Sequence, residues 1–152
     1  MLMIYDTVSE AKVTGKVADA VAAGMKEAGV PVEAYFIGNA NKVNVKDYEC
    51  LIIGAPTMAW RPSKRMKEFL ATLEGSDLSG KVAATFDTQL RSSVSGNATK
   101  HMEKSLAHLG CRIAVPSLLA YVESEGKVYQ LKNGEMEKVR AWGRDLAKAL
   151  PK

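Results

Sequence analysis

Short apolar strands and amphipathic helices alternate along the whole chain. The strand segments are rich in Leu, Ile, Val and Ala, whereas the helical segments repeat apolar residues at intervals of three or four. Such alternation predicts a parallel sheet that is covered by helices on both faces. The predicted strands cover 1–5, 30–37, 48–53, 81–86, 112–115 and 117–122. The predicted helices run from 14 to the glycine at 29, up to about 73, over 98–109 and over 135–150.

Right-handed crossovers leave few ways to arrange five such strands. We expect one domain over 1–152, a three-layer αβα sandwich whose five-stranded parallel sheet has the order 2-1-3-4-5. In that order, ligands bind outside the carboxyl ends of the strands, between the loops after strands one and three. Pro116 interrupts the fifth strand and suggests an edge or a bulge, and residues 123–131 are expected to form a hairpin or a loop excursion.

Composition excludes several classes of protein. Hydrophobic residues make up 47% of the chain and charged residues 25%, as in ordinary soluble globular proteins. No apolar run approaches the ~20 residues of a membrane span, and the start of the chain lacks the features of a signal peptide, so we expect a cytoplasmic protein without membrane contact. Cys50 and Cys111 lack metal-ligand spacing and are expected to be buried thiols. His101 and His108 are expected to be surface or half-buried residues of a helix, and Trp142 is expected in the apolar stripe of the last helix.

The net charge is +4, with 17 acidic residues interspersed among 21 basic ones. One local basic cluster, Arg61, Lys64, Arg65 and Lys67, stands apart from this scatter. It is either a solvated helix face or a docking rim for an acidic partner. Nucleic-acid binding is not expected, because neither a dense basic stripe nor a known module is present.

The segment 51–70 contains the most specific pattern in the chain. The apolar run Leu51-Ile52-Ile53 is followed by Gly54-Ala55-Pro56-Thr57, which we expect to form a loop, and then by Trp60 and a helical pattern. Such a loop offers a hydroxyl, backbone amides, a guanidinium and a flat aromatic ring, which together suit a planar cofactor with polar edges. In the alternative interpretation, the segment is an ordinary strand-turn-helix junction whose Trp covers the core.

Two motifs resemble those of the flavodoxin family. Gly54-Ala55-Pro56-Thr57 is similar to the family's G-S-P-T loop, and a helix with Met66-Lys67-Glu68-Phe69-Leu70 follows it. Phe86-Asp87-Thr88 is similar to the F-D-T-R sequence of one branch, with Gln89 in place of Arg. The resemblance covers nearly the whole chain. It implies non-covalent FMN, held by the loops after strands one, three and four.

The first of these loops departs from the family's T-x-T-G-N-T pattern, because its Gly and Asn are missing. Hydroxyls of Thr7, Ser9 and Thr14 and the ammonium of Lys12 remain to hold the phosphate at a helix N-terminus. By the resemblance, Trp60 would stack on the flavin ring, and Asp87 and Thr88 would meet its pyrimidine end. The candidate cofactor-binding residues are Thr7, Val8, Ser9, Ala11, Lys12, Thr14, Pro56, Thr57, Met58, Ala59, Trp60, Arg61, Asp87, Thr88, Gln89, Ser95 and Gly96.

The favoured function is an FMN-dependent electron carrier, because the cofactor then supplies the chemistry and no catalytic residue is needed. We identify no catalytic or metal-binding candidates in the sequence. The expected partner is an acidic redox protein such as a ferredoxin. Two alternatives stay open: an FMN-dependent NAD(P)H:quinone-type reductase, and a signalling or interaction module that uses the same fold without a flavin.

Overall fold

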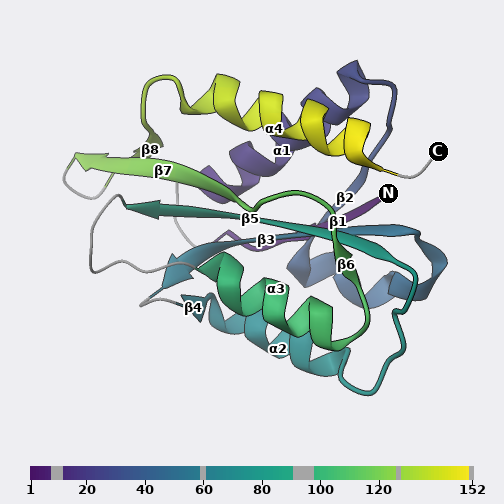
Figure 1. Cartoon of the computed structure of the whole chain (residues 1–152). Coiled ribbons are helices and arrows are strands. Elements are labelled where there is room, and N and C mark those ends of the chain that lie inside the picture. The colour runs from purple at the N-terminus through teal and green to yellow at the C-terminus, as the bar shows by residue number, and fades with distance from the viewer. Residues whose placement is uncertain (8–11, 59–60, 91–97, 126–127, 151–152) are drawn as a thin grey trace.

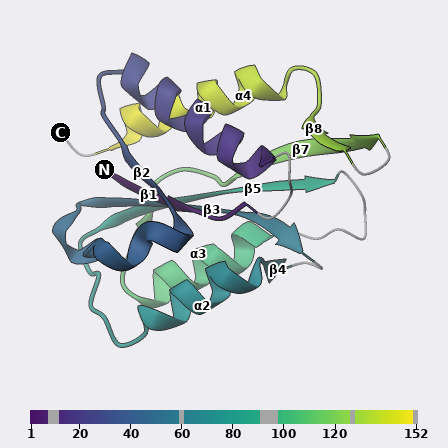
Figure 2. The same ribbon diagram turned by 180° about the vertical axis from the view of Figure 1, so that it is seen from behind.

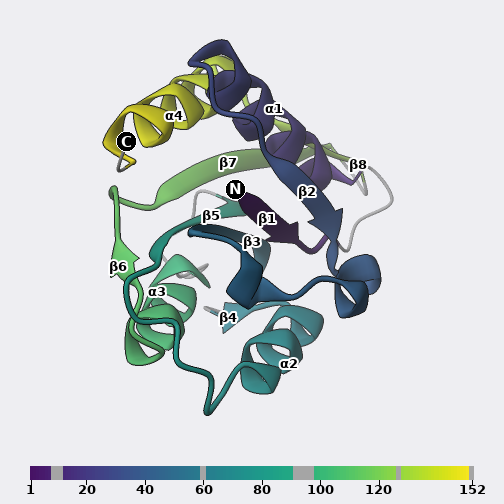
Figure 3. The ribbon, with the colours of Figure 1, turned by 90° about the vertical axis from the view of Figure 1, so that its right-hand side faces the viewer.

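A central sheet lies between two pairs of helices (Figure 1, Figure 3). The computed structural model describes residues 1–7, 12–58, 61–90, 98–125 and 128–150. Helices α1 (Val13–Glu27) and α4 (Glu135–Ala149) cover one face, and α2 (Lys64–Thr72) and α3 (Ala98–His108) cover the other. Two short 3₁₀ helices, η1 (Ile37–Lys42) and η2 (Val45–Asp47), join the second strand to the third. The expected three-layer αβα sandwich is confirmed.

In the described residues the sheet has eight strands rather than the predicted five. Its main path is β2-β1-β3-β5-β7-β8, with β4 paired to β3 and β6 paired to β5. The strands are β1 (Leu2–Tyr5), β2 (Glu33–Phe36), β3 (Cys50–Met58), β4 (Arg61–Pro62), β5 (Val82–Leu90), β6 (Arg112–Ile113), β7 (Leu118–Glu125) and β8 (Val128–Leu131).

The predicted strand order is confirmed for the parallel part of the sheet. Strands β2, β1, β3 and β5, followed by β6 and β7, occupy the places of the order 2-1-3-4-5. The fifth predicted strand is divided into β6 and β7 around Pro116, as its proline indicated. The predicted count is wrong because two antiparallel strands are added, β4 on β3 and β8 on β7. The β7–β8 pair is the hairpin expected near the C-terminal end.

Strands β3 and β5 are longer than predicted, and both motifs lie within them. Gly54-Ala55-Pro56-Thr57 is part of β3 and not a loop, because Gly54 is needed for close packing instead of for a turn. A Cβ atom at Gly54 would lie only 2.0 Å from Cζ of the buried Phe86 ring. Pro56 is tolerated because β1 pairs with β3 only as far as Gly54, so this part of the ladder has one open side.

Alternate strand residues point to two apolar cores. Ile53, Met66 and Met102 belong to the core beneath α2 and α3, whereas Ile52 and Val21 belong to the core beneath α1 and α4. Both cysteines are buried and free, as expected, and burial raises the pKa of Cys50 to about 12. These thiols are therefore protonated packing groups at neutral pH.

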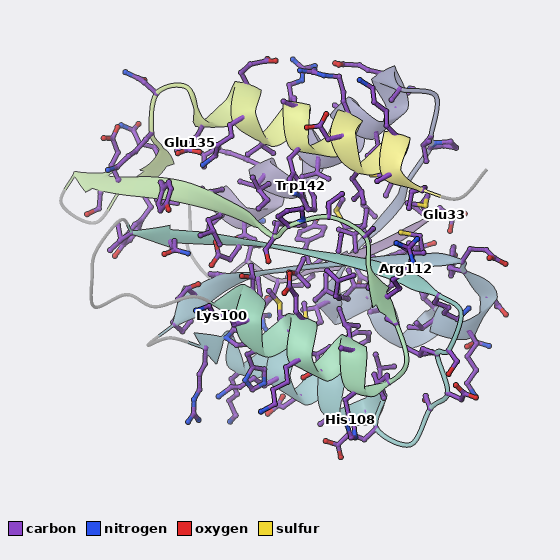
Figure 4. The ribbon with its side chains drawn as sticks, viewed as in Figure 1. Glu33, Lys100, His108, Arg112, Glu135 and Trp142 are labelled. Carbon is purple, nitrogen blue, oxygen red and sulfur yellow. The ribbon has the colours of Figure 1, made fainter. Side chains whose placement is uncertain are left out.

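Trp142 lies on α4 and packs against the core, as its position in the apolar stripe indicated (Figure 4). Its ring meets Phe86 edge to face, and its indole N–H donates to the carbonyl oxygen of Pro116 at 2.9 Å. Beside this contact α1 and α4 lie close together (Figure 2), and Gly24 and Gly143 permit this approach because they have no side chain. A Cβ atom at Gly24 would lie 2.2 Å from the backbone of α4, and one at Gly143 would lie 2.5 Å from the backbone of α1. None of the described helices is long and apolar enough to cross a membrane.

Candidate functional site

A pocket of about 330 Å³ opens at the carboxyl ends of β3 and β5. One wall comes from the start of α1, two come from these strands, and one comes from the β7–β8 hairpin. This is the position at which the order 2-1-3-4-5 predicts a binding crevice. Its lining residues are Val13, Thr14, Pro56, Thr57, Met58, Thr88, Gln89, Leu90, Val122 and Tyr129.

Large apolar side chains stand exposed in this pocket's lining. Met58 is 50% exposed, Leu90 43% and Tyr129 39%. Among the described residues, Met136 is the only other large hydrophobic residue with comparable exposure. Exposed apolar side chains gathered at a concave site indicate a ligand with an apolar face.

Hydroxyl groups line the polar part of the pocket and are held by specific hydrogen bonds. The side-chain oxygens of Thr14 and Thr88 lie 2.7 Å apart and tie α1 to β5. The hydroxyl of Thr57 donates to Asp87 Oδ2 at 2.7 Å and accepts from the backbone N–H of Ala98 at 3.0 Å. The first residue of α3 is therefore fixed to the end of β3.

Asp87 is fully buried behind this wall. Burial raises the pKa of its carboxyl to about 6, although hydrogen bonds from Thr57 and from Gln89 Nε2, at 2.8 Å, act in the opposite direction. Its second oxygen, Oδ1, is buried and has no hydrogen-bond partner among the described residues. An acceptor with unused capacity is thus placed next to the pocket.

A second buried acid, Asp6, organises the chain after β1. Asp6 is 0% exposed; it accepts from the N–H of Thr7 at 2.8 Å and from the hydroxyl of Ser63 at 2.5 Å. The guanidinium of Arg65 lies 2.7 Å from Asp6 Oδ1 and also donates to the carbonyl oxygen of Thr7 at 3.0 Å. Arg65 also lies over the ring of Phe36. Its charge therefore holds Asp6 and Thr7 in place, a role that the sequence did not predict for this member of the basic cluster.

The start of α1 has unused capacity for an anion. Its N-cap, Lys12, is exposed and adopts the left-handed conformation (φ 51°, ψ 44°), and no side chain caps the helix in the described structure. The hydroxyl oxygen of Thr7 is buried without a partner among the described residues. Uncapped N–H groups and the helix dipole favour negative charge at such a position.

The structure brings together six of the predicted site residues in the pocket wall: Thr14, Pro56, Thr57, Met58, Thr88 and Gln89. Four others lie outside the pocket lining: Thr7 and Lys12 before α1, Arg61 exposed on β4, and Asp87 behind the wall. The remaining predictions, Val8, Ser9, Ala11, Ala59, Trp60, Ser95 and Gly96, lie outside the described residues.

Sequence reasoning missed four residues of the pocket wall: Val13, Leu90, Val122 and Tyr129. Leu90 was missed because the strand before it was expected to end near Asp87. Val122 and Tyr129 were missed because the hairpin was recognised but not placed beside the site. The available signal was Tyr129, an aromatic residue within a predicted excursion. In the described residues, no group of three or more His, Cys, Asp or Glu side chains is arranged to hold a metal ion.

Comparisons with known proteins identify the fold. No family model and no curated protein matches the sequence. Among solved structures, oxidised flavodoxin 1 from Bacillus cereus is 22% identical, with a TM-score of 0.79 over 99% of this chain and 98% of that one. A flavodoxin from the domain Archaea is 20% identical, with a TM-score of 0.75 over 97% of both chains.

A longer protein contains a similar domain. The rubredoxin oxygen:oxidoreductase of Desulfovibrio gigas is 17% identical, with a TM-score of 0.71 over 97% of this chain but only 35% of that one. The two flavodoxins, in contrast, match over nearly their full lengths. The chain therefore has a flavodoxin-like fold.

Proposed function

We propose that this chain binds FMN non-covalently and carries electrons between partner proteins. The observation that supports this most strongly is the pocket where α1, β3 and β5 meet, in the crevice that this strand order provides for a ligand. The flavodoxin-like fold supports FMN as the ligand.

The chemistry of the pocket suits the parts of FMN. The exposed side chains of Met58, Leu90 and Tyr129 provide apolar contacts for the flavin ring. The amide of Gln89 provides polar groups for its edges, whereas the hydroxyl of Thr57 is engaged by Asp87 and by the backbone N–H of Ala98. Lys12 and the first turn of α1, which no described side chain caps, suit the phosphate, whereas the hydroxyl of Thr14 is already engaged by Thr88.

Each part of the chain then has a limited task. Bound FMN supplies the electron-transfer chemistry, and the protein binds it, orients it and limits its contact with water. Thr57 is held in place by its hydrogen bonds with Asp87 and with the backbone of Ala98. The stacking role of Trp60 and the contacts of Val8, Ser9, Ala11, Ala59, Ser95 and Gly96 stay predictions from the sequence.

We further propose that the redox partner is acidic at its docking face, as a ferredoxin is. The net charge of +4 supports this proposal, as do the exposed side chains of Arg61, which pairs with Met58 of β3, and of Lys64 at the start of α2. Complementary charge chiefly accelerates the encounter between two proteins, and salt screens it.

The visible absorption spectrum of the purified protein tests the proposed cofactor. We expect the bands of an oxidised flavin, either at once or after FMN is added and the excess removed. A protein that retains no flavin after this treatment would contradict the proposal and favour an interaction module on the same fold. Rapid oxidation of NADPH by the loaded protein, without a partner protein, would instead favour a reductase.

A further inference from the structure

A groove of about 410 Å³ runs between α2 and α3, on the face of the sheet opposite α1 and α4. Its floor is apolar and is formed by Leu70, Ala71 and Leu109, whereas its rim is rich in nitrogen-bearing side chains. The rim residues are Lys67, Glu74, His101, Lys104, Ser105 and His108. Figure 4 shows His108 at the end of α3 and Lys100 near its start.

The basic side chains around this groove are not neutralised by acids. In the described part of the chain, none of Arg61, Lys67, Lys100 and Lys104 forms an ion pair. Basic residues on α4 are arranged differently. Lys138 contacts Glu135, while Arg140 and Arg144 both contact Glu27. Positive charge on the α2–α3 face is therefore available to an external partner.

The pKa of His101 reflects the positive charges around the groove. Its pKa is lowered, first by partial burial and then by the charges of Arg61, Lys67 and Lys104. These groups face it from β4, α2 and α3, and Glu74 and His108 complete the charged or titratable lining. Carboxylates placed in the groove would offset this repulsion and favour the protonated imidazole.

One end of the groove is close to the proposed flavin pocket. The backbone N–H of Ala98, at the start of α3, donates to the hydroxyl of Thr57 in the pocket wall. Strand β4 packs against α3 and is paired with Thr57 and Met58. A protein docked along the groove would therefore reach the pocket without crossing the rest of the surface.

We propose that the α2–α3 groove is the docking site for an acidic segment of the electron-transfer partner. Lys67, Lys104 and His101 contact that segment, and Arg61 extends the contact towards the pocket. Arg65 takes no part because it is engaged by Asp6. This inference rests on the proposed function, since it gives the docking residues for the same electron exchange.

Two double variants with the same net charge test this proposal. Lys67→Glu with Lys104→Glu reverses charge in the groove, and Lys26→Glu with Lys148→Glu reverses it on α1 and α4. Lys26 and Lys148 are exposed lysines without ion pairs among the described residues. Each Lys→Glu change removes two charges, so both variants go from +4 to zero.

The probe is a reduced, acidic plant-type [2Fe–2S] ferredoxin mixed with the FMN-loaded protein in a stopped-flow instrument. At low ionic strength, we expect the groove variant to accept electrons roughly tenfold more slowly than wild type, and the control variant to stay within about twofold. High salt should bring all three rates together. Equal slowing of both variants, or of neither, would overturn the proposed site.

Direct binding separates this inference from the proposed function, because calorimetric titration with oxidised ferredoxin requires no flavin. We expect affinity to rise between pH 7.5 and pH 6 in wild type, and to rise less in His101→Gln. If the protein binds no FMN but the groove variant still loses ferredoxin affinity selectively, only the proposed function fails. If FMN binds and the groove variant has the same affinity for ferredoxin as wild type, only this inference fails.

Discussion

Asp87 is fully buried, and one of its carboxylate oxygens has no hydrogen-bond partner among the described residues, so its ionisation should have a measurable effect on stability. Its pKa is about 6 in the folded chain, against 3.8 for an ordinary Asp, so the folded state retains a proton that the unfolded state loses. The free energy of unfolding should therefore fall as pH rises from about 4 to about 6. The loss due to this group is at most about 3 kcal/mol.

The variant Asp87→Asn tests this prediction through urea unfolding at several pH values. Its stability relative to wild type should improve as pH rises through this window, because the amide cannot ionise. Parallel profiles for the two proteins would show that Asp87 does not titrate between these limits.

The two tryptophans should have different roles. Trp142 packs on Phe86 and is hydrogen-bonded to Pro116, so Trp142→Ala should lower the free energy of unfolding by roughly 3 kcal/mol, near the lower end for large core truncations. Trp60→Ala should instead weaken FMN binding by roughly 1–3 kcal/mol, as lost stacking contacts do. Urea unfolding and FMN titration of both variants distinguish these effects, and reversed results would contradict both assignments.

The packing of β3 on β5 depends on the absence of a side chain at Gly54. In Gly54→Ala the new methyl group would overlap the Phe86 ring, which is fully buried and held against Trp142. We expect a loss of roughly 1–3 kcal/mol, typical of overpacked cores. The matched control is Gly15→Ala in α1, where the nearest atom is 3.6 Å away and a gain of up to about 1 kcal/mol is expected. Thermal unfolding compares the two, and similar Tm values would refute the packing argument.

Helices and strands were predictable where an apolar repeat extended through them. The stripe with Met102 and Leu106 located α3, and the proline at 116 marked the break between β6 and β7. The far end of β3 was not predictable, because Gly54 and Pro56 are usual turn residues. In the structure, Gly54 makes room for the ring of Phe86, and Pro56 lies where β3 is no longer paired with β1. Both conditions depend on the neighbouring strands and not on the local sequence.

At the scale of the whole fold, the strand order could be predicted from the alternation of strands and helices and from the handedness of crossovers. The position of the pocket could then be predicted from the strand order. Side-chain partners did not follow. The pairing of Thr14 with Thr88 joins residues 74 positions apart, and the engagement of Arg65 by Asp6 removes one member of a basic cluster. These contacts are fixed by tertiary packing, which no local pattern contains.

The most direct test of the proposed function is a titration of the apoprotein with FMN and with riboflavin, followed by quenching of flavin fluorescence. The two ligands share the ring and differ in the phosphate, which we assign to the start of α1 near Lys12 and Thr7, where no described side chain caps the helix. We predict one-to-one binding that is much tighter for FMN than for riboflavin. Equal affinities would remove the phosphate role from this loop, and the absence of binding by either ligand would contradict the proposal that the pocket holds a flavin.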